Sequence, residues 1–129
     1  MLIMEKKKIL LVDDNPDITR PLSLILEATD RYVTREENLG QRALETAREF
    51  KPDLIFLDFM MPEMDGNEVA AQIEEDEELK HIKIVFLTGI VTKGEIESGS
   101  VNNISGYAVL AKPVKAQEMI SCIEDLLGA

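Results

Sequence analysis

Short apolar runs alternate along the chain with segments in which apolar residues recur every three or four positions. Each run is rich in aliphatic residues and bounded by charged or turn-forming residues, which is typical of a buried strand. We predict five strands, at residues 8–13, 31–36, 53–58, 82–87 and 106–111. The other segments predict helices over residues 16–28 and 39–50, after residue 67, over residues 92–99 (a short helix at best) and over residues 115–127.

Capping and turn-forming residues set the expected helix boundaries. Asn15 is a suitable N-cap for the first helix, and Pro16 suits its first position, where no helical N–H bond is lost. Pro21 lies inside this helix but close to its start, Pro52 ends the second helix, and Asn67 is the expected cap of the third. The expected buried faces are Ile18, Leu22, Ile25 and Leu26 in the first helix, Leu39, Ala43, Leu44, Ala47 and Phe50 in the second, and Val69, Ala70 and Ile73 in the third.

This alternation indicates an α/β fold of five βα units, (βα)5, in which helices cover both faces of a parallel sheet. Right-handed crossovers leave few arrangements, and we predict the flavodoxin-like, doubly wound strand order 2-1-3-4-5. The length fits one domain over residues 1–129, with residues 1–5 as a flexible tail. In such sheets, ligands bind at the carboxyl ends of the strands, near the point where the strand order reverses.

The composition restricts the classes of function. A formal net charge of −11 argues against direct binding of nucleic acid or an anionic membrane, and suits a metal cation or a partner with a basic face. No apolar run approaches the roughly 18 residues of a membrane span, and the first residues do not form a secretory signal. We therefore expect a cytoplasmic protein. The single cysteine, Cys122, permits no internal disulfide and is expected to be a small buried residue of the last helix.

Polar residues follow four of the predicted strands where each strand ends. Asp13 and Asp14 follow the first strand, and Asp58 ends the third, which is its neighbour in the predicted order. Three carboxylates at one place repel one another unless a cation enters, and hard oxygen ligands of this kind favour Mg²⁺. An aspartate there can attack phosphorus, and Thr88 and Lys112, after the fourth and fifth strands, can bind phosphoryl oxygens.

Each of these residues also has an ordinary structural interpretation. Aspartate and asparagine often end strands and cap helices, and a threonine often occupies a turn. Only their joint occurrence at the strand ends that can meet indicates a common site. We interpret the acidic residues 74–78 as a solvated helix face rather than a docking surface, and His81, which has no second ligand nearby in the sequence, as a surface residue.

These motifs together resemble the receiver domain of two-component response regulators. The resemblance rests on Val12-Asp13-Asp14-Asn15, on Asp58 through Gly66, on Leu87-Thr88-Gly89 and on Lys112-Pro113, and extends from about Lys6 to Leu127. The spacing also agrees, because 44 positions separate Asp14 from Asp58 and 30 separate Asp58 from Thr88.

The resemblance implies that Asp58 accepts a phosphoryl group from a phosphohistidine, on a sensor histidine kinase or a phosphotransfer protein. It implies a Mg²⁺ site held by Asp13, Asp14, Asp58 and the backbone carbonyl of Met60, in which Asp14 binds the ion directly and Asp13 binds it through water. It implies that Thr88 and Lys112 bind the phosphoryl oxygens. Phosphorylation would then change the surface that a downstream protein or effector domain contacts. The chain would not be an enzyme, beyond slow self-dephosphorylation.

Two departures from the family pattern concern the output of the signal. The family usually has an aromatic residue three positions before the lysine, where this chain has Val109, and the nearest aromatic residue is Tyr107. The segment from Thr88 to Lys112, 24 positions apart, is also about two residues longer than is usual in the family. We therefore expect that Tyr107 does not switch rotamers and that output passes through residues 89–99.

The resemblance carries two further expectations about the site. The Lys112-Pro113 peptide bond should be cis and aim the lysine amine at the site. Met60 and Ile90 should lie at its mouth, where neither side chain can orient a water molecule, so the aspartyl phosphate should be long-lived.

Two alternatives remain from the sequence. Phosphatases of the haloacid-dehalogenase type also use an aspartate nucleophile with Mg²⁺, but they carry a second acid two positions after the nucleophile on the first strand, a pattern absent here. A receiver-like interaction module that is never phosphorylated is the other alternative. Steady turnover of a phosphoester would indicate the first, and a lack of Mg²⁺-dependent labelling by acetyl phosphate the second.

Overall fold

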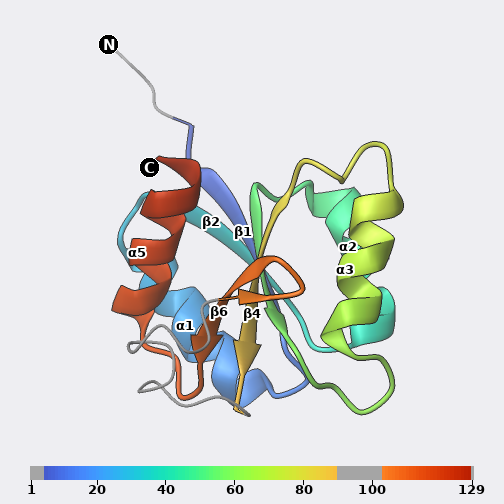
Figure 1. The fold of residues 1–129 in the computed structure, drawn as a ribbon. Coiled ribbons are helices and arrows are strands. Elements are labelled where there is room, and N and C mark those ends of the chain that lie inside the picture. The colour runs from blue at the N-terminus through green and yellow to red at the C-terminus, as the bar shows by residue number, and fades with distance from the viewer. Residues whose placement is uncertain (1–4, 90–102, 129) are drawn as a thin grey trace.

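The computed structural model describes residues 5–89 and 103–128, so the short helix expected at residues 92–99 lies outside the described residues. One sheet lies between two layers of helices (Figure 1). The elements are β1 (Lys7–Val12), α1 (Pro16–Ala28), β2 (Tyr32–Glu37), η1 (Gly40–Arg42), α2 (Ala43–Phe50), β3 (Leu54–Asp58), α3 (Gly66–Glu75), β4 (Lys83–Thr88), β5 (Asn103–Ile104), β6 (Tyr107–Ala111) and α5 (Ala116–Leu127).

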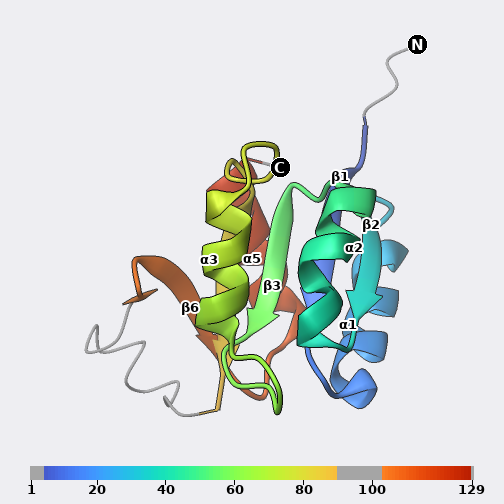
Figure 2. The ribbon, with the colours of Figure 1, turned by 90° about the vertical axis from the view of Figure 1, so that its right-hand side faces the viewer.

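The sheet has the strand order β2-β1-β3-β4-β6-β5. The first five strands in that order pair in parallel, and β6 is the fifth strand predicted from the sequence. The predicted flavodoxin-like fold and strand order are therefore confirmed. Helices α1 and α5 cover one face of the sheet, and α2 and α3 cover the other (Figure 2).

Each central strand contributes buried side chains to both faces, because successive residues of a strand point to opposite sides. The side beneath α2 and α3 contains Leu10, Val12, Ile55, Leu57, Ile84 and Phe86. The side beneath α1 and α5 contains Ile9, Leu11, Leu54, Phe56, Val85 and Leu87. This double burial explains why these strands are continuously apolar in the sequence, and it makes the sheet a rigid support for the residues at its carboxyl edge.

The sheet also has a short edge strand that the sequence did not predict. β5 pairs antiparallel with β6, with Ile104 opposite Tyr107. Ser105 and Gly106 form the two-residue turn between them, with φ angles of 54° and 86°. Two successive positive φ angles match the twist of a tight hairpin, and glycine adopts this conformation at little cost. The observed strand β6 therefore begins at Tyr107, one residue later than predicted, because Gly106 belongs to the turn.

Two helices begin elsewhere than expected. Leu39 is 55% exposed and precedes a 3₁₀ turn, so α2 proper begins at Ala43, and the predicted place of Leu39 on the buried face is wrong. Its backbone is extended, with its N–H donating to the Glu37 carboxylate at 3.0 Å. Helix α3 begins at Gly66, because the Asp65 carboxylate, rather than Asn67, caps it by accepting from the Glu68 N–H at 3.0 Å.

The first helix begins as predicted. The Asn15 side chain caps it by accepting from the Asp17 N–H at 2.9 Å, and Pro21 is accommodated within the helix. Leu22 and Leu26 are buried, but Ile25 is 49% exposed, so its expected place on the buried face is wrong. Among residues 5–89 and 103–128, no helix has both the length and the apolar character needed to cross a bilayer.

Candidate functional site

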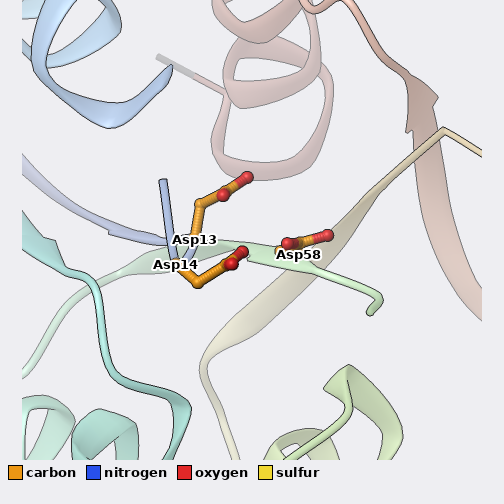
Figure 3. Close-up of side chains that lie close together, drawn as sticks. All are labelled: Asp13, Asp14 and Asp58. Atoms are coloured by element: carbon orange, nitrogen blue, oxygen red, sulfur yellow. The ribbon is translucent and has the colours of Figure 1, made fainter. Parts of the chain in front are cut away.

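Three carboxylates converge where β1 and β3 end. Asp13, Asp14 and Asp58 each offer an oxygen, and these oxygens all lie within 4.8 Å of one another (Figure 3). They meet because β1 and β3 are adjacent, with Val12 opposite Leu57. Asp13 and Asp58 are buried, whereas Asp14 is exposed. The cluster is therefore open to solvent on the Asp14 side and closed beneath.

The Asp13 side chain and backbone are held at four points. Its Oδ1 accepts from the Asn15 N–H at 3.0 Å, and its Oδ2 lies 2.8 Å from the ammonium nitrogen of Lys112. Its N–H donates to the Glu37 carbonyl at 3.2 Å, and its own carbonyl accepts from the Asn38 amide at 2.7 Å. These contacts fix the end of β1.

Lys112 directly follows β6 and reaches the carboxylates from the same edge of the sheet. Its ammonium nitrogen also lies 3.2 Å from Asp58 Oδ1, so it bridges two acids. Burial opposes its charge, but the neighbouring Asp13 and Asp58 outweigh that cost and raise the Lys112 pKa. The Lys112 N–H donates to the Thr88 carbonyl at 2.8 Å, and the Lys112–Pro113 bond is cis, as predicted.

The Asp58 carboxyl group resists ionisation. Burial, and then the charge of Asp13, raise its pKa to about 6, while Lys112 and the Met60 N–H act in the opposite direction. That N–H donates to Asp58 Oδ1 at 3.3 Å, and the Met60 side chain is 61% exposed. A cation near Asp58 would therefore relieve an unfavourable charge. The Met60 carbonyl as a metal ligand stays a prediction.

Thr88 and Gly66 flank Asp58, Thr88 on the neighbouring strand β4 and Gly66 at the start of α3. Thr88 ends β4, the strand next to Asp58, and is almost fully buried. Gly66 begins α3 so close behind that a Cβ there would lie 2.7 Å from the Asp58 carbonyl oxygen and 2.9 Å from Phe59 Cα. Any residue other than glycine would push the helix away from the Asp58 backbone.

The structure thus brings together Asp13, Asp14, Asp58, Thr88 and Lys112, all at strand ends. Their chemical roles stay predictions. Ile90, expected at the mouth of the site, lies outside the described residues. Asn38, which was not predicted from the sequence, also lies at this edge, directly after β2, with its side-chain amide donating to the Asp13 carbonyl at 2.7 Å.

Several other candidate residues lie away from the site. His81 is exposed and precedes β4, and Cys122 is partly buried in α5. The acidic residues 74–78 are not all merely solvated, because the Asp76 carboxylate accepts from the Glu78 N–H and from Arg48, both at 2.9 Å. These two contacts lower the Asp76 pKa.

The aromatic residue considered for signal output is held in place. The Tyr107 ring packs edge-to-face against Phe86, with centroids 5.4 Å apart, and Phe86 packs in the same way against Phe59 at 5.3 Å. Burial raises the Tyr107 pKa, and so does the hydrogen bond that its hydroxyl donates to Glu74. Val109 lies in the core beneath α2 and α3.

Comparison with known proteins identifies the family. The model of the response regulator receiver domain matches residues 9–124. The chain belongs to this family. A receiver domain of this kind is a component of two-component signalling, and family members are generally signalling switches rather than enzymes.

Whole-chain relatives support the assignment. The receiver is similar to the polar-differentiation response regulators DivK of Brucella anthropi, at 33% identity over 95% of this chain and 97% of the relative, and of Brucella ovis, at 34% over the same shares. Among solved structures, it is similar to the receiver domain of the sensor histidine kinase PA1611 from Pseudomonas aeruginosa, with a TM-score of 0.78, 26% identity and coverage of 97% and 100%. That structure has a magnesium ion coordinated in its active-site cleft.

The fold likeness extends to more distant proteins. Vibrio cholerae chemotaxis protein CheY4 superposes with a TM-score of 0.79 at 24% identity, over 95% of this chain and 99% of that one. At that identity, the likeness concerns the fold alone.

Proposed function

We propose that this receiver is a Mg²⁺-dependent phosphoacceptor and that Asp58 carries the phosphoryl group. The observation that supports this most is the convergence of Asp13, Asp14 and Lys112 on the buried Asp58 carboxylate at the carboxyl edge of the sheet. Burial and a second acid raise the pKa of Asp58. A carboxyl group perturbed in this way at the carboxyl edge of a parallel sheet is more typical of a reactive site than of a stabilising contact.

The residues present fit a magnesium ion. Carboxylate oxygens are the ligands that Mg²⁺ prefers, and the exposed Asp14 gives the ion access to the two buried acids. Asp13, Asp14, Asp58 and the Met60 carbonyl would hold it. When bound, the ion would neutralise charge on the carboxylates and on the transferring phosphoryl oxygens. The magnesium in the related PA1611 receiver domain supports this assignment.

The transfer itself is a displacement at phosphorus. A carboxylate oxygen of Asp58 forms the new bond to phosphorus as the bond from phosphorus to the donor histidine nitrogen breaks, and the histidine leaves with that electron pair. Lys112, already 3.2 Å from Asp58 Oδ1, offers an ammonium group to one phosphoryl oxygen. Thr88, at the end of the adjacent strand, offers a hydroxyl group to another.

The proposed donor is a sensor histidine kinase or a phosphotransfer protein. Phosphorylation would change the surface that a downstream protein or effector domain contacts. The exposed Met60 side chain provides no group to orient an attacking water, so self-dephosphorylation should be slow. We place this activity in the cytoplasm and propose residues 1–129 as one receiver domain.

Labelling with radioactive acetyl phosphate tests the proposal. Wild-type protein in Mg²⁺ should take up one phosphoryl group per chain, and the same protein in EDTA, or Asp58→Asn in Mg²⁺, should take up almost none. No labelling of the wild type would favour a module that is never phosphorylated. Continuous release of phosphate from phosphoesters would favour a phosphatase.

A further inference from the structure

Asn38 occupies a place in the site that neither the motif set nor the carboxylate cluster includes. It follows β2 directly, and its side-chain nitrogen donates to the Asp13 carbonyl at 2.7 Å. The preceding residue, Glu37, accepts from the Asp13 N–H at 3.2 Å. Two consecutive residues at the end of β2 therefore hold both backbone polar groups of Asp13.

The Asn38 amide is itself fixed. An amide NH₂ has two donor hydrogens, and the second contact of this nitrogen is with Thr19 Oγ at 3.1 Å. Thr19 is 2% exposed and donates in turn to the Glu36 carboxylate at 2.8 Å, which pairs with Arg20 at 2.9 Å. A chain of polar contacts thus ties Asn38 to α1 and β2 together.

The contact with the Asp13 carbonyl matters for Asp14. The peptide group joining Asp13 to Asp14 is planar, so fixing its carbonyl oxygen also fixes the direction in which the Asp14 backbone leaves β1. Asp14 is the exposed member of the carboxylate cluster, with no strand around it to hold it. Its position relative to Asp13 and Asp58 depends on this peptide group.

We propose that Asn38 is a positioning residue for the magnesium site, acting by holding the Asp13–Asp14 peptide group through its side-chain amide. This inference rests on the proposed function, since it concerns the ion that the three acids would hold. Residues that orient metal ligands from behind typically contribute about 10- to 100-fold in metal affinity. Asn38 is also only partly buried and, with Asp14, lines a cavity of about 280 Å³, so substitutions there should leave the folded core intact.

Magnesium binding measured by calorimetry tests this inference in four proteins. Asn38→Ala should raise the Mg²⁺ dissociation constant about tenfold relative to the wild type. Thr19→Val, which removes the group that fixes the amide, should raise it less. Asn67→Ala is the matched control, because Asn67 is an exposed asparagine whose side chain accepts from Ser105, away from the carboxylates, and it should bind Mg²⁺ like the wild type.

A positioning role predicts a split that a merely structural role would not produce. At saturating Mg²⁺, Asn38→Ala should regain the wild-type rate of phosphorylation by acetyl phosphate, because the amide of Asn38 donates to the Asp13 carbonyl and to Thr19 rather than to Asp58. A dissociation constant within about twofold of wild type, or an equal loss in Asn67→Ala, would overturn the inference. If Asn38→Ala does not fold, an unchanged constant in Thr19→Val overturns it. If the wild type itself binds no Mg²⁺, the proposed function fails instead.

Discussion

At the scale of single residues, the ionised Asp58 carboxylate destabilises the folded state, and a bound cation would relieve that cost. The Asp58 pKa of about 6 lies above the ordinary value near 3.8, because burial and Asp13 oppose its ionisation. For an acid whose pKa rises on folding, ionisation favours the unfolded state. The resulting destabilisation is absent below the unfolded pKa, grows between the two values and is complete above about pH 6.

Asp58→Asn should therefore unfold at a higher temperature than the wild type at pH 7.5 in EDTA. Lys112 keeps Asp13 as a partner in the variant, so no cation is left unpaired. The difference between the two midpoints should shrink as pH falls from 6 toward 4, where the wild-type carboxyl group is neutral in the folded state. Calorimetric melts across this range decide the matter, and an equal or lower midpoint for the variant at pH 7.5 would show that Asp58 stabilises the fold.

The Lys112 ammonium group should compete with a cation for the same oxygens. It lies 2.8 Å from Asp13 and 3.2 Å from Asp58, two of the proposed ligands. Lys112→Met should bind Mg²⁺ several-fold more tightly, because its removal leaves three carboxylates without a compensating charge. The same variant should be labelled more slowly by acetyl phosphate. Lys83→Met, which removes an exposed charge at the opposite end of β4, is the control, and equal or weaker Mg²⁺ binding by Lys112→Met would contradict the competition.

The acids, the threonine and the lysine were predictable because each directly follows an apolar strand whose place in the sheet is limited by topology. Asn38 was not predicted, because its contact is with the backbone of Asp13 rather than with a charged side chain. That contact depends on the register that places Val12 opposite Glu37, which residue types alone do not determine.

At the scale of elements, the strands that are buried on both faces were predicted to within one or two residues. The errors occur where the local backbone conformation determines where an element begins. β5 has two residues and exists because Ser105 and Gly106 adopt positive φ angles. Leu39 fits the helical spacing in the sequence, but in the structure its backbone is extended and it precedes a 3₁₀ turn. Such short segments carry too few residues to show a period.

The packing of β6 against α3 gives a prediction about signal output. Because the Tyr107 ring packs against Phe86 and its hydroxyl is hydrogen-bonded to Glu74, we expect the ring to stay in place on activation. NMR spectra of the free and beryllofluoride-bound protein should show large shifts for residues 88–99 and a static Tyr107 ring. A ring that moves between exposed and buried positions, with residues 88–99 unshifted, would refute this expectation.

At the scale of the whole molecule, the net charge of −11 and the acidic cluster act in the same direction, since both are relieved by bound cations. Mg²⁺ should raise the unfolding temperature in a saturable manner, because an ion that binds only the folded state stabilises it by about 2.7 kcal/mol at 100 times its dissociation constant. Sodium chloride at matched ionic strength separates specific binding from screening. Equal effects of the two salts would mean that no specific site is filled.

Chemical trapping can show directly whether Asp58 itself carries the phosphoryl group. After reaction with acetyl phosphate in Mg²⁺, sodium borohydride reduces an aspartyl phosphate to homoserine, which changes the mass of one peptide and identifies its position by fragmentation. We expect homoserine at position 58 in the Mg²⁺ sample and none in the EDTA sample. Homoserine at position 13 or 14, or none at position 58 in a protein that has taken up phosphate, would contradict it.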